Sequence, residues 1–413
     1  MSAGEPGAWG VDRLVLLAPI EPATTGNGLA MRAELFRCAA AVELDVETVV
    51  VPVAGRLVAA DSRVTIVAVD AERARSGALA LAADPAWSDR LALASPLPLP
   101  ARLASPGLVD EAACAVDSSG TVAVHVVRAY MAPLGIALGE RLGARWTTLD
   151  LDDDDAAFAS AFGDLDAARA YERLLGVFGR EFHGLCAASA NEAVSIGRRH
   201  RLAVDSLPNA VRVRGLPASR PVRAVSRETS LLFVGNLTYQ PNVEAAEQLV
   251  GTILPALRDR LAGRVSVTLV GPHAGRLEHL RADDVEVTGF VPSLESFYAS
   301  ATVVVAPIRH GAGTRIKLLE AFAYGVPVVA SSAAANGLEV VDGRHLLLAD
   351  NCDEAVAAIE AILAEEGLAP RLIDEAGRLV RARYSFEVVA PAVRDFFARA
   401  DARARSGQRA TID

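Results

Sequence analysis

Two cations and a carboxylate follow a glycine-containing turn in the second half of the sequence. The stretch HGAGTRIKLLEAFAYGVPVVAS, residues 310–331, places Arg315 and Lys317 just after the turn and Glu320 three residues further on. Lys317 is the only lysine of the chain, and the other 40 of its 41 basic residues are arginine. A lysine retained against such a bias indicates a need for a compact, flexible ammonium group rather than a planar guanidinium.

The residues around these charges predict a strand, a turn, a helix and a second strand. Thr314 is a helix-capping residue type, so Arg315 and Lys317 fall in the first helical turn, where the backbone already carries partial positive charge. Cations and free amide groups together form a site for an anion, and a diphosphate is a natural occupant. Glu320 can accept hydrogen bonds from a ribose diol. The plainer alternative is a solvated helix end with an ordinary i,i+3 pair of Lys317 and Glu320.

Composition and charge place the chain among globular proteins. Of its 413 residues, 52% are hydrophobic and 22% are charged, and the formal net charge is −10. The negative charge argues against a nucleic-acid partner held by a broad basic field. The four cysteines form no CxxC pair, which indicates neither a zinc site nor a disulfide framework. With no signal peptide pattern and no apolar run long enough to span a membrane, we expect a cytoplasmic protein without a membrane span.

Short β-branched runs alternate with helical stretches in both halves of the chain, which predicts parallel α/β layers. A polar, Arg/Pro-rich segment at 211–230 interrupts this rhythm and is interpreted as a linker. We therefore predict two doubly wound α/β domains, 1–210 and 231–385, with ligands at the carboxyl ends of the parallel strands. A helix at 386–405 is apolar enough to dock on a domain, and the tail 406–413 is predicted to be disordered.

The motif GxGTRxKxLEAxAxGxPVV at 311–329 resembles the signature of glycosyltransferase family 4, nucleotide-sugar enzymes with the two-domain GT-B fold. FVGNLTYQPNVEAA, LVGP and VEVTGFVPSLESFYASATVVVAP, which precede it, occur in the order typical of that family. LPNAV at 207–211 resembles the family's junction before the second domain. YSFEVVA at 384–390 resembles the segment before a last helix that crosses back to the first domain. The first half resembles the family mainly through its first strand, the loop with Gly26 and Gly28, and the helix with Arg32.

The resemblance implies transfer of a sugar from a nucleoside-diphosphate sugar to an acceptor hydroxyl, with retention of anomeric configuration. It implies two domains facing across a cleft and no metal or cofactor, because the nucleoside-diphosphate sugar is a co-substrate. The acceptor would be a small molecule, a glycan or a lipid-linked sugar, as in glycan or glycoside biosynthesis. Arg315 and Lys317 would act on the leaving diphosphate. The donor-binding residues would be Gly26, Gly28, Gly235, Asn236, Phe290, Val291, Gly311, Ala312, Gly313, Thr314 and Glu320.

Two positions depart from the family pattern. The family commonly has two glutamates separated by seven residues; the second corresponds to Glu320, but Ala312 occupies the first position. The family also often places an arginine and a lysine just after the first strand of the second domain, and these positions correspond to Asn236 and Pro241. The phosphate charge must then be met chiefly by the two cations of the quoted motif.

Candidate residues of the first half are less specific. His125 lies on a predicted buried strand and is a catalytic candidate, although a lone histidine there is more often packed in a core. Arg128, at the end of that strand, and Arg32 are candidates for contact with the acceptor or the donor.

The stretch LDLDDDD at 149–155 places Asp150 and Asp152 on one face of an extended segment. Such carboxylates suit Mg²⁺ or Ca²⁺, but the resemblance implies that fixed positive charge replaces a metal. We expect Asp152 or Asp153 to face the cleft near the acceptor hydroxyl, with a solvated surface as the alternative for the others.

Two other functions fit the same residues. A nucleotide-sugar epimerase on this fold would convert the donor without an acceptor. A noncatalytic partner would bind the nucleotide sugar without turnover, a reading that Ala312 favours and that the intact Arg315, Lys317 and Glu320 oppose.

Overall fold

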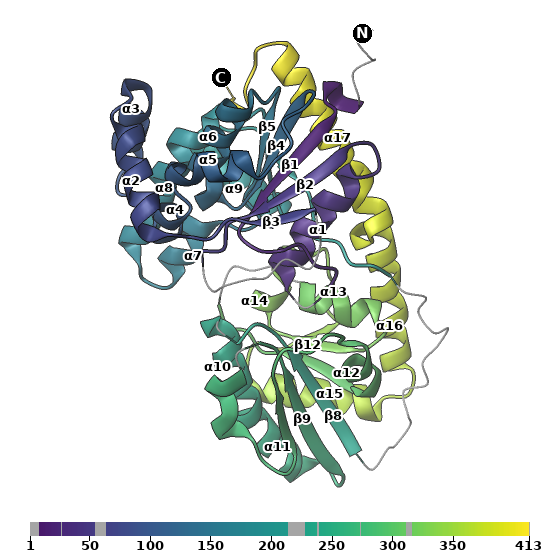
Figure 1. Ribbon diagram of the computed structural model, residues 1–413. Coiled ribbons are helices and arrows are strands. Elements are labelled where there is room, and N and C mark those ends of the chain that lie inside the picture. The colour runs from purple at the N-terminus through teal and green to yellow at the C-terminus, as the bar shows by residue number, and fades with distance from the viewer. Residues whose placement is uncertain are drawn as a thin grey trace. The chain divides into compact units, whose positions relative to one another are not determined.

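The computed structural model describes residues 8–25, 27–53, 63–213, 228–237, 239–272, 274–310 and 316–412. It divides into two compact units (Figure 1). Unit 1 comprises the described parts of Met1–Pro22, Arg32–Pro208 and Ala390–Asp413. Unit 2 comprises those of Ala23–Met31 and Asn209–Val389.

Unit 1 is built on a parallel sheet, to which the described residues contribute seven strands in the order β3-β2-β1-β4-β5-β6-β7. Their bounds are β1 Arg13–Ala18, β2 Asp45–Val50, β3 Val64–Ile66, β4 Val122–Val127, β5 Thr147–Asp150, β6 Gly184–Ala187 and β7 Val204–Ser206. The order reverses between β1 and β4, and the carboxyl ends of the two strands at such a reversal are where doubly wound sheets bind ligands.

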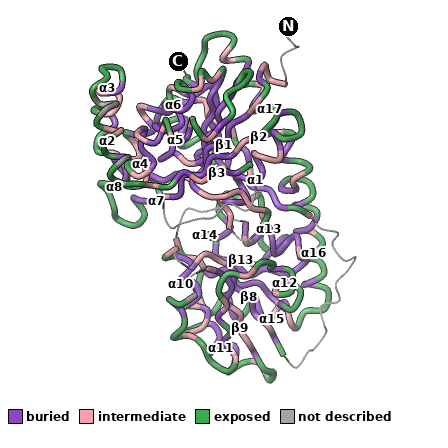
Figure 2. Tube along the Cα trace, in the orientation of Figure 1, coloured by how far each residue is buried: buried purple, intermediate pink, exposed green. Residues whose placement is uncertain are grey.

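Helices connect these strands. They are α1 Gly28–Ala40, α2 Ala71–Ala82, α3 Pro85–Ala94, α4 Leu99–Leu103, α5 Val109–Cys114, α6 Ala132–Leu142, α7 Asp155–Ala161, α8 Leu165–Phe178 and α9 Ala190–His200. Polar side chains begin several of them: Asp84, Asp154, Asp164 and Ser189 each accept a hydrogen bond from a first-turn N–H group, which satisfies a donor that the helix leaves free. The strands are largely buried, as a parallel sheet covered on both faces requires (Figure 2).

Unit 2 repeats this plan with six strands among the described residues, in the order β10-β9-β8-β11-β12-β13. Their bounds are β8 Glu228–Val234, β9 Arg264–Val270, β10 Val285–Thr288, β11 Val303–Ala306, β12 Val328–Ala330 and β13 Leu347–Leu348. Here the order reverses between β8 and β11, so the predicted ligand position in this unit is at the carboxyl ends of these two strands.

The helices of unit 2 begin with α10 Gln240–Gln248, which continues through a π-helical turn at Leu249–Ile253 into α11 Leu254–Arg260. The others are α12 Glu295–Ser300, α13 Ile316–Ala323, α14 Ser332–Ala335, α15 Cys352–Ala364 and α16 Leu368–Leu379. Gly325, with a φ of 68°, follows α13 in the left-handed conformation that glycine favours. The last helix, α17 Phe386–Arg405, contributes its residues from Ala390 onward to unit 1.

The prediction of two doubly wound parallel α/β sheets is confirmed. Ala274–Leu280 forms a 3₁₀ helix. Most of the predicted linker, 214–227, lies outside the described residues. Within the described residues, no helix is long and apolar enough to cross a membrane.

The prediction that the tail 406–413 is disordered is wrong for its described part, 406–412. Ala410 is fully buried, and its N–H group donates to the Phe182 carbonyl at 2.9 Å while its carbonyl accepts from the Ala203 N–H at 3.0 Å. Thr411 forms a β-bridge with Leu202. The composition of the tail is polar, but these backbone hydrogen bonds depend on no particular side chain, so no sequence pattern indicates them.

Candidate functional site

The second sheet brings two chain segments together where its strand order reverses. After β8 the chain passes through Gly235 and Asn236 and enters α10. After β11 it passes through 307–310, and α13 begins at Ile316. Because the carboxyl ends of parallel strands lie along one edge of a sheet, the first turns of α10 and α13 border the same position.

Lys317 is the second residue of α13 and is partly exposed. Its Nζ lies 2.5 Å from Oδ1 of Asn242, the third residue of α10. It also lies 4.7 Å from the centroid of the Phe233 ring in β8, a favourable cation–π distance. The ammonium group on α13 is therefore held by two residues of the β8–α10 segment, across the reversal.

The turn after β8 is closely packed. Nδ2 of Asn242 donates to the Asn236 carbonyl at 2.8 Å, and a Cβ on Gly235 would come within 2.9 Å of the Asn242 side chain. A Cβ on Gly271, which follows β9, would lie 1.8 Å from the Gly235 carbonyl oxygen. Since real Cβ atoms do not approach backbone oxygen so closely, only glycine at 271 lets the two turns pack in this way.

Glu320 lies almost one helical turn beyond Lys317 and is only 7% exposed. The Tyr298 hydroxyl donates to its Oε2 at 3.4 Å. Burial raises the pKa of Glu320 to about 7, although the Tyr298 hydroxyl and the charge of Lys317 act in the opposite direction. The carboxyl also lines a pocket of unit 2 together with Thr24, Thr25, Met31, Val211, Arg212, Ala323 and Tyr324.

The other predicted donor residues are only partly described. Phe290 follows β10 and is 74% exposed, and Val291 beside it is partly exposed. Gly28 is the first residue of α1, where the Asn27 side chain accepts the Leu29 N–H at 2.9 Å. Gly26, Gly311, Ala312, Gly313, Thr314 and Arg315 lie outside the described residues.

In unit 1 the predicted role of Arg32 in contacting a substrate is wrong. Its side chain is fully buried, and its Nε and Nη2 donate to the two carboxylate oxygens of Asp150, each at 2.7 Å. Nη1 donates to the Leu207 carbonyl at 3.0 Å. Burial lowers the pKa of Arg32, but the Asp150 carboxylate outweighs this and raises it overall. The Arg32 guanidinium therefore links α1 to β5 in the interior of the unit.

Arg128 forms ion pairs with several carboxylates of the acidic stretch after β5. Its guanidinium contacts Asp152 at 3.3 Å and Asp153 at 3.1 Å, and it also donates to Asp155. Burial raises the pKa of Asp155 to about 6. Among the described residues, no group of three or more His, Cys, Asp or Glu side chains is arranged to hold a metal ion.

The geometry separates the two aspartates that we considered for the acceptor side. Asp152 is 1% exposed, so the prediction that it faces a cleft is wrong. Its φ of 57° shows that the backbone turns there rather than staying extended, and this turn directs the carboxylate toward the two arginines. Asp153 keeps 13% of its side chain exposed.

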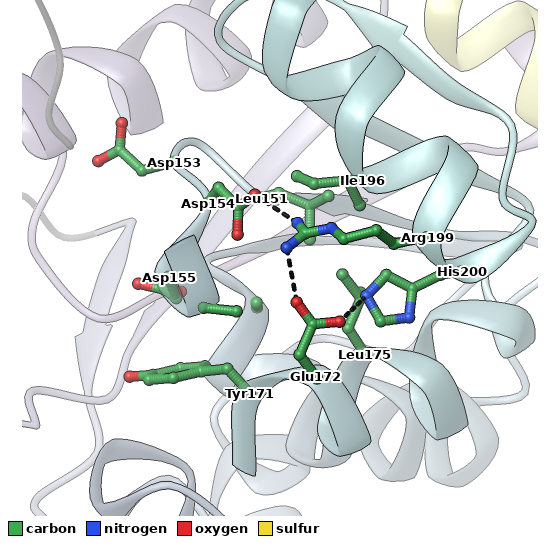
Figure 3. A pocket seen from close by; sticks show the side chains of 12 residues that line it. Leu151, Asp153, Asp154, Asp155, Tyr171, Glu172, Leu175, Ile196, Arg199 and His200 are labelled. Carbon is green, nitrogen blue, oxygen red and sulfur yellow. Dashed lines mark hydrogen bonds and ion pairs between the residues drawn. The ribbon is translucent and has the colours of Figure 1, made fainter. Parts of the chain in front are cut away.

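The neighbouring pocket, seen in Figure 3, is bordered by the loop after β5 and by α8 and α9. Arg199 lies between Asp154 and Glu172 and bonds to both, and Glu172 also pairs with His200 at 2.8 Å. These contacts connect the two helices to the acidic loop. Several carboxylates of the loop are therefore bound within the protein, and the alternative prediction that they form a solvated surface does not hold for them.

His125 is a core residue, and its candidacy as a catalytic group is wrong. It is fully buried, and its ring lies 4.1 Å from that of Phe36 and 5.3 Å from that of Phe397, measured between centroids. Its Nδ1 is 2.8 Å from the Thr148 hydroxyl. Burial lowers its pKa to about 3, so it is neutral at physiological pH.

Asn242 is the residue of this site that sequence reasoning missed. The family pattern directed attention to Asn236 and Pro241, whereas the contact to Lys317 comes from the next residue. A proline followed by asparagine at the start of a helix was an available signal, because proline suits a first helical turn and a short amide there lies close to the preceding turn.

Parts of the chain resemble known proteins in sequence. Residues 228–365 match the family model described as Glycosyl transferases group 1. An uncharacterized glycosyltransferase of Methanocaldococcus jannaschii is 28% identical over 183 residues, which cover 41% of this chain and 45% of that protein. An exopolysaccharide phosphotransferase of Streptomyces coelicolor is 29% identical over 173 residues, 40% of this chain and 17% of that protein. The chain thus spans less than half the length of these relatives.

Solved structures resemble nearly the whole chain. Sucrose-phosphate synthase from Thermosynechococcus elongatus superimposes with a TM-score of 0.67 at 16% identity, covering 94% of this chain and 99% of that one. The Anabaena protein HepE, solved in complex with UDP-glucose, gives 0.62 at 14% identity, covering 93% and 98%. At these identities the likeness concerns the fold, and it confirms the predicted GT-B architecture.

Proposed function

Because residues 228–365 form a domain of the Glycosyl transferases group 1 family within a GT-B fold, we propose that the chain transfers a sugar from a nucleoside-diphosphate sugar to an acceptor hydroxyl. One observation carries the proposal: the single lysine of the chain is held at the first turn of α13, where the strand order of the second sheet reverses. This is where a doubly wound sheet binds a phosphate-containing ligand.

The chemistry that we assign to this position is stabilisation of the leaving diphosphate. Negative charge develops on the diphosphate as its bond to the sugar breaks, and Lys317 meets that charge without having to reorganise. Arg315, two residues earlier in the sequence, adds a second cation, and Glu320 accepts hydrogen bonds from the ribose. Since fixed cations meet the charge, the proposal requires no metal. The leaving phosphate assists deprotonation of the acceptor on the same face of the sugar, which retains the anomeric configuration.

Phe290 and Val291 are assigned to the nucleotide base. They follow β10 on the carboxyl edge of the second sheet, and Phe290 is 74% exposed and therefore open to stacking. HepE has been solved with UDP-glucose, so UDP-glucose is the first donor to test.

Asp153 and Arg128 are assigned to the acceptor. They lie at the carboxyl ends of β5 and β4 in unit 1, and both keep part of their side chains exposed. A carboxylate that is paired with an arginine keeps an oxygen that can accept a hydrogen bond from a sugar hydroxyl.

The test is Lys317→Ala, assayed for transfer from a panel of nucleoside-diphosphate sugars. Loss of one preorganised donor to a developing anion typically costs about 10²–10³ in rate, so we expect kcat to fall by that factor while the fold survives. Arg258→Ala is the matched control, because Arg258 is an exposed cation of the same unit that pairs with Asp284, the residue before β10. Wild-type turnover by the Lys317 variant contradicts the proposal. Conversion of the donor to an epimer without acceptor would establish the epimerase instead.

A further inference from the structure

We propose that Asn242 is the positioning residue of the diphosphate site, acting through Lys317. Its side-chain oxygen fixes the ammonium group at the mouth of the site and leaves the positive charge of Lys317 available to the ligand. The inference rests on the proposed function, because it takes the ligand to be the diphosphate of a nucleotide. It adds a residue from a different helix, α10, whose side chain carries no charge.

The contact is short and its partners are well placed. Asn242 Oδ1 lies 2.5 Å from Lys317 Nζ, and Asn242 is only 5% exposed. An ammonium group has three N–H donors, so the bond to Asn242 uses only one of them. The Phe233 ring, whose centroid is 4.7 Å from Nζ, restrains the same group without accepting a conventional hydrogen bond.

The amide itself cannot turn away. Its Nδ2 donates to the Asn236 carbonyl at 2.8 Å, which fixes which end of the amide faces Lys317. The backbone N–H of Asn242 donates to the Tyr239 carbonyl at 2.9 Å, and Gly235 leaves just enough room for the amide above it. Because Asn242 is itself fixed by the turn after β8, it fixes the ammonium group on α13 relative to that turn.

A neutral partner suits an anion site better than a charged one. A carboxylate at 242 would hold Lys317 at least as firmly, but its negative charge would oppose an incoming diphosphate. An alanine would remove one restraint on the flexible four-carbon side chain of Lys317, so more of its ordering would have to accompany ligand binding, which weakens binding. The amide restrains the lysine and adds no net charge, so both substitutions should weaken diphosphate binding for different reasons.

The first experiment compares UDP with uridine, which lacks the phosphates. A calorimetric screen of UDP, GDP, ADP and dTDP comes first. If another diphosphate binds better than UDP, that diphosphate and its nucleoside are used instead of UDP and uridine. Asn242→Ala should weaken the diphosphate about tenfold and leave the nucleoside, followed by saturation-transfer NMR, unchanged. Asn242→Asp, which keeps the shape of the side chain, should weaken the diphosphate at least as much. Gln240→Ala is the matched control, because this exposed amide of the same helix bonds Glu244 and Arg276.

The second experiment is a double-mutant cycle with Lys317→Ala. If Asn242 acts through Lys317, Asn242→Ala has no further effect on diphosphate affinity once the lysine is gone, whereas a merely structural role gives additive losses. Additive losses, or a diphosphate affinity that neither Asn242 variant changes, overturn the inference while leaving the proposed function intact. If no nucleoside diphosphate of the screen binds the wild-type protein, the proposed function fails and this inference fails with it.

Discussion

In both units a basic side chain lies where the strand order of the sheet reverses. In unit 1 it is Arg32, on the helix after β1, and in unit 2 it is Lys317, on the helix that follows β11. Arg32 is fully buried and both oxygens of Asp150 accept its hydrogen bonds, whereas Lys317 is partly exposed and donates to the neutral amide of Asn242.

The difference shows that position in the topology does not by itself make an anion site. A buried guanidinium needs a carboxylate, because an uncompensated charge in a core is very costly, and once paired it presents little charge to a ligand. A cation held by an amide near the surface retains its charge. The partner of the cation, rather than the cation, separates the structural role of Arg32 in unit 1 from the proposed binding role of Lys317 in unit 2.

The largest effect that would test this contrast is on the stability of unit 1. Arg32→Ala leaves Asp150 buried without its partner, and breaking a buried pair in this way typically costs about 3–5 kcal/mol of unfolding free energy. We expect urea unfolding to show a loss of that size. The control is Arg37→Ala on the same helix, which removes the ion-pair partner of Glu34. Because the Arg37 side chain is 28% exposed, this change should cost no more than about 1 kcal/mol.

The opposite outcome is equally informative. An Arg32→Ala variant that keeps its stability but loses affinity for a donor or an acceptor would return Arg32 to the substrate role that the sequence predicted. The contrast between the two reversals would then be lost.

Much of the fold could be predicted because its signals are local. Apolar runs such as 303–306 and 122–127 read as buried parallel strands, and each is fully buried in the structure. The tail escaped prediction because it is held by backbone hydrogen bonds to Phe182 and Ala203, which lie some two hundred residues away in sequence. No pattern in the tail itself records such partners.

The candidate site divides in the same way. Lys317 and Glu320 stood out because their helix follows a strand and a glycine turn. His125, Arg32 and Asp152 are also residue types that can take part in catalysis or binding, but their burial decides their roles. That burial depends on contacts with Phe397, Asp150 and Arg128, which sequence spacing does not show. Asn242 was missed because its amide is uncharged, and the search for site residues followed charged side chains and the family pattern.

A second prediction concerns the pH dependence of unit 2. Glu320 has a pKa of about 7 in the folded chain, against a reference value of 4.5. Between these values the folded chain holds a proton that the unfolded chain releases, so stability present below pH 4.5 is lost as the pH rises to 7. The shift corresponds to about 3 kcal/mol. Glu320→Gln stays neutral and should remove this loss.

The measurement is the change in unfolding free energy of unit 2 between pH 5 and pH 8. Glu366→Gln, which replaces an exposed carboxyl of the same unit, is the control and should keep the wild-type dependence. An identical pH dependence in the wild type and in Glu320→Gln would mean that Glu320 is already ionised at neutral pH, as an ordinary solvated carboxylate would be.

The smallest effect distinguishes burial from hydrogen bonding as the cause of that shift. The Tyr298 hydroxyl, 3.4 Å from Glu320 Oε2, favours the ionised carboxylate and lowers its pKa, whereas burial raises it. Tyr298→Phe removes only the hydroxyl, so the pH range over which stability is lost should move upward by a fraction of a unit. The same pH–stability curve measures it. A downward move would show that the hydroxyl stabilises the protonated acid rather than the carboxylate.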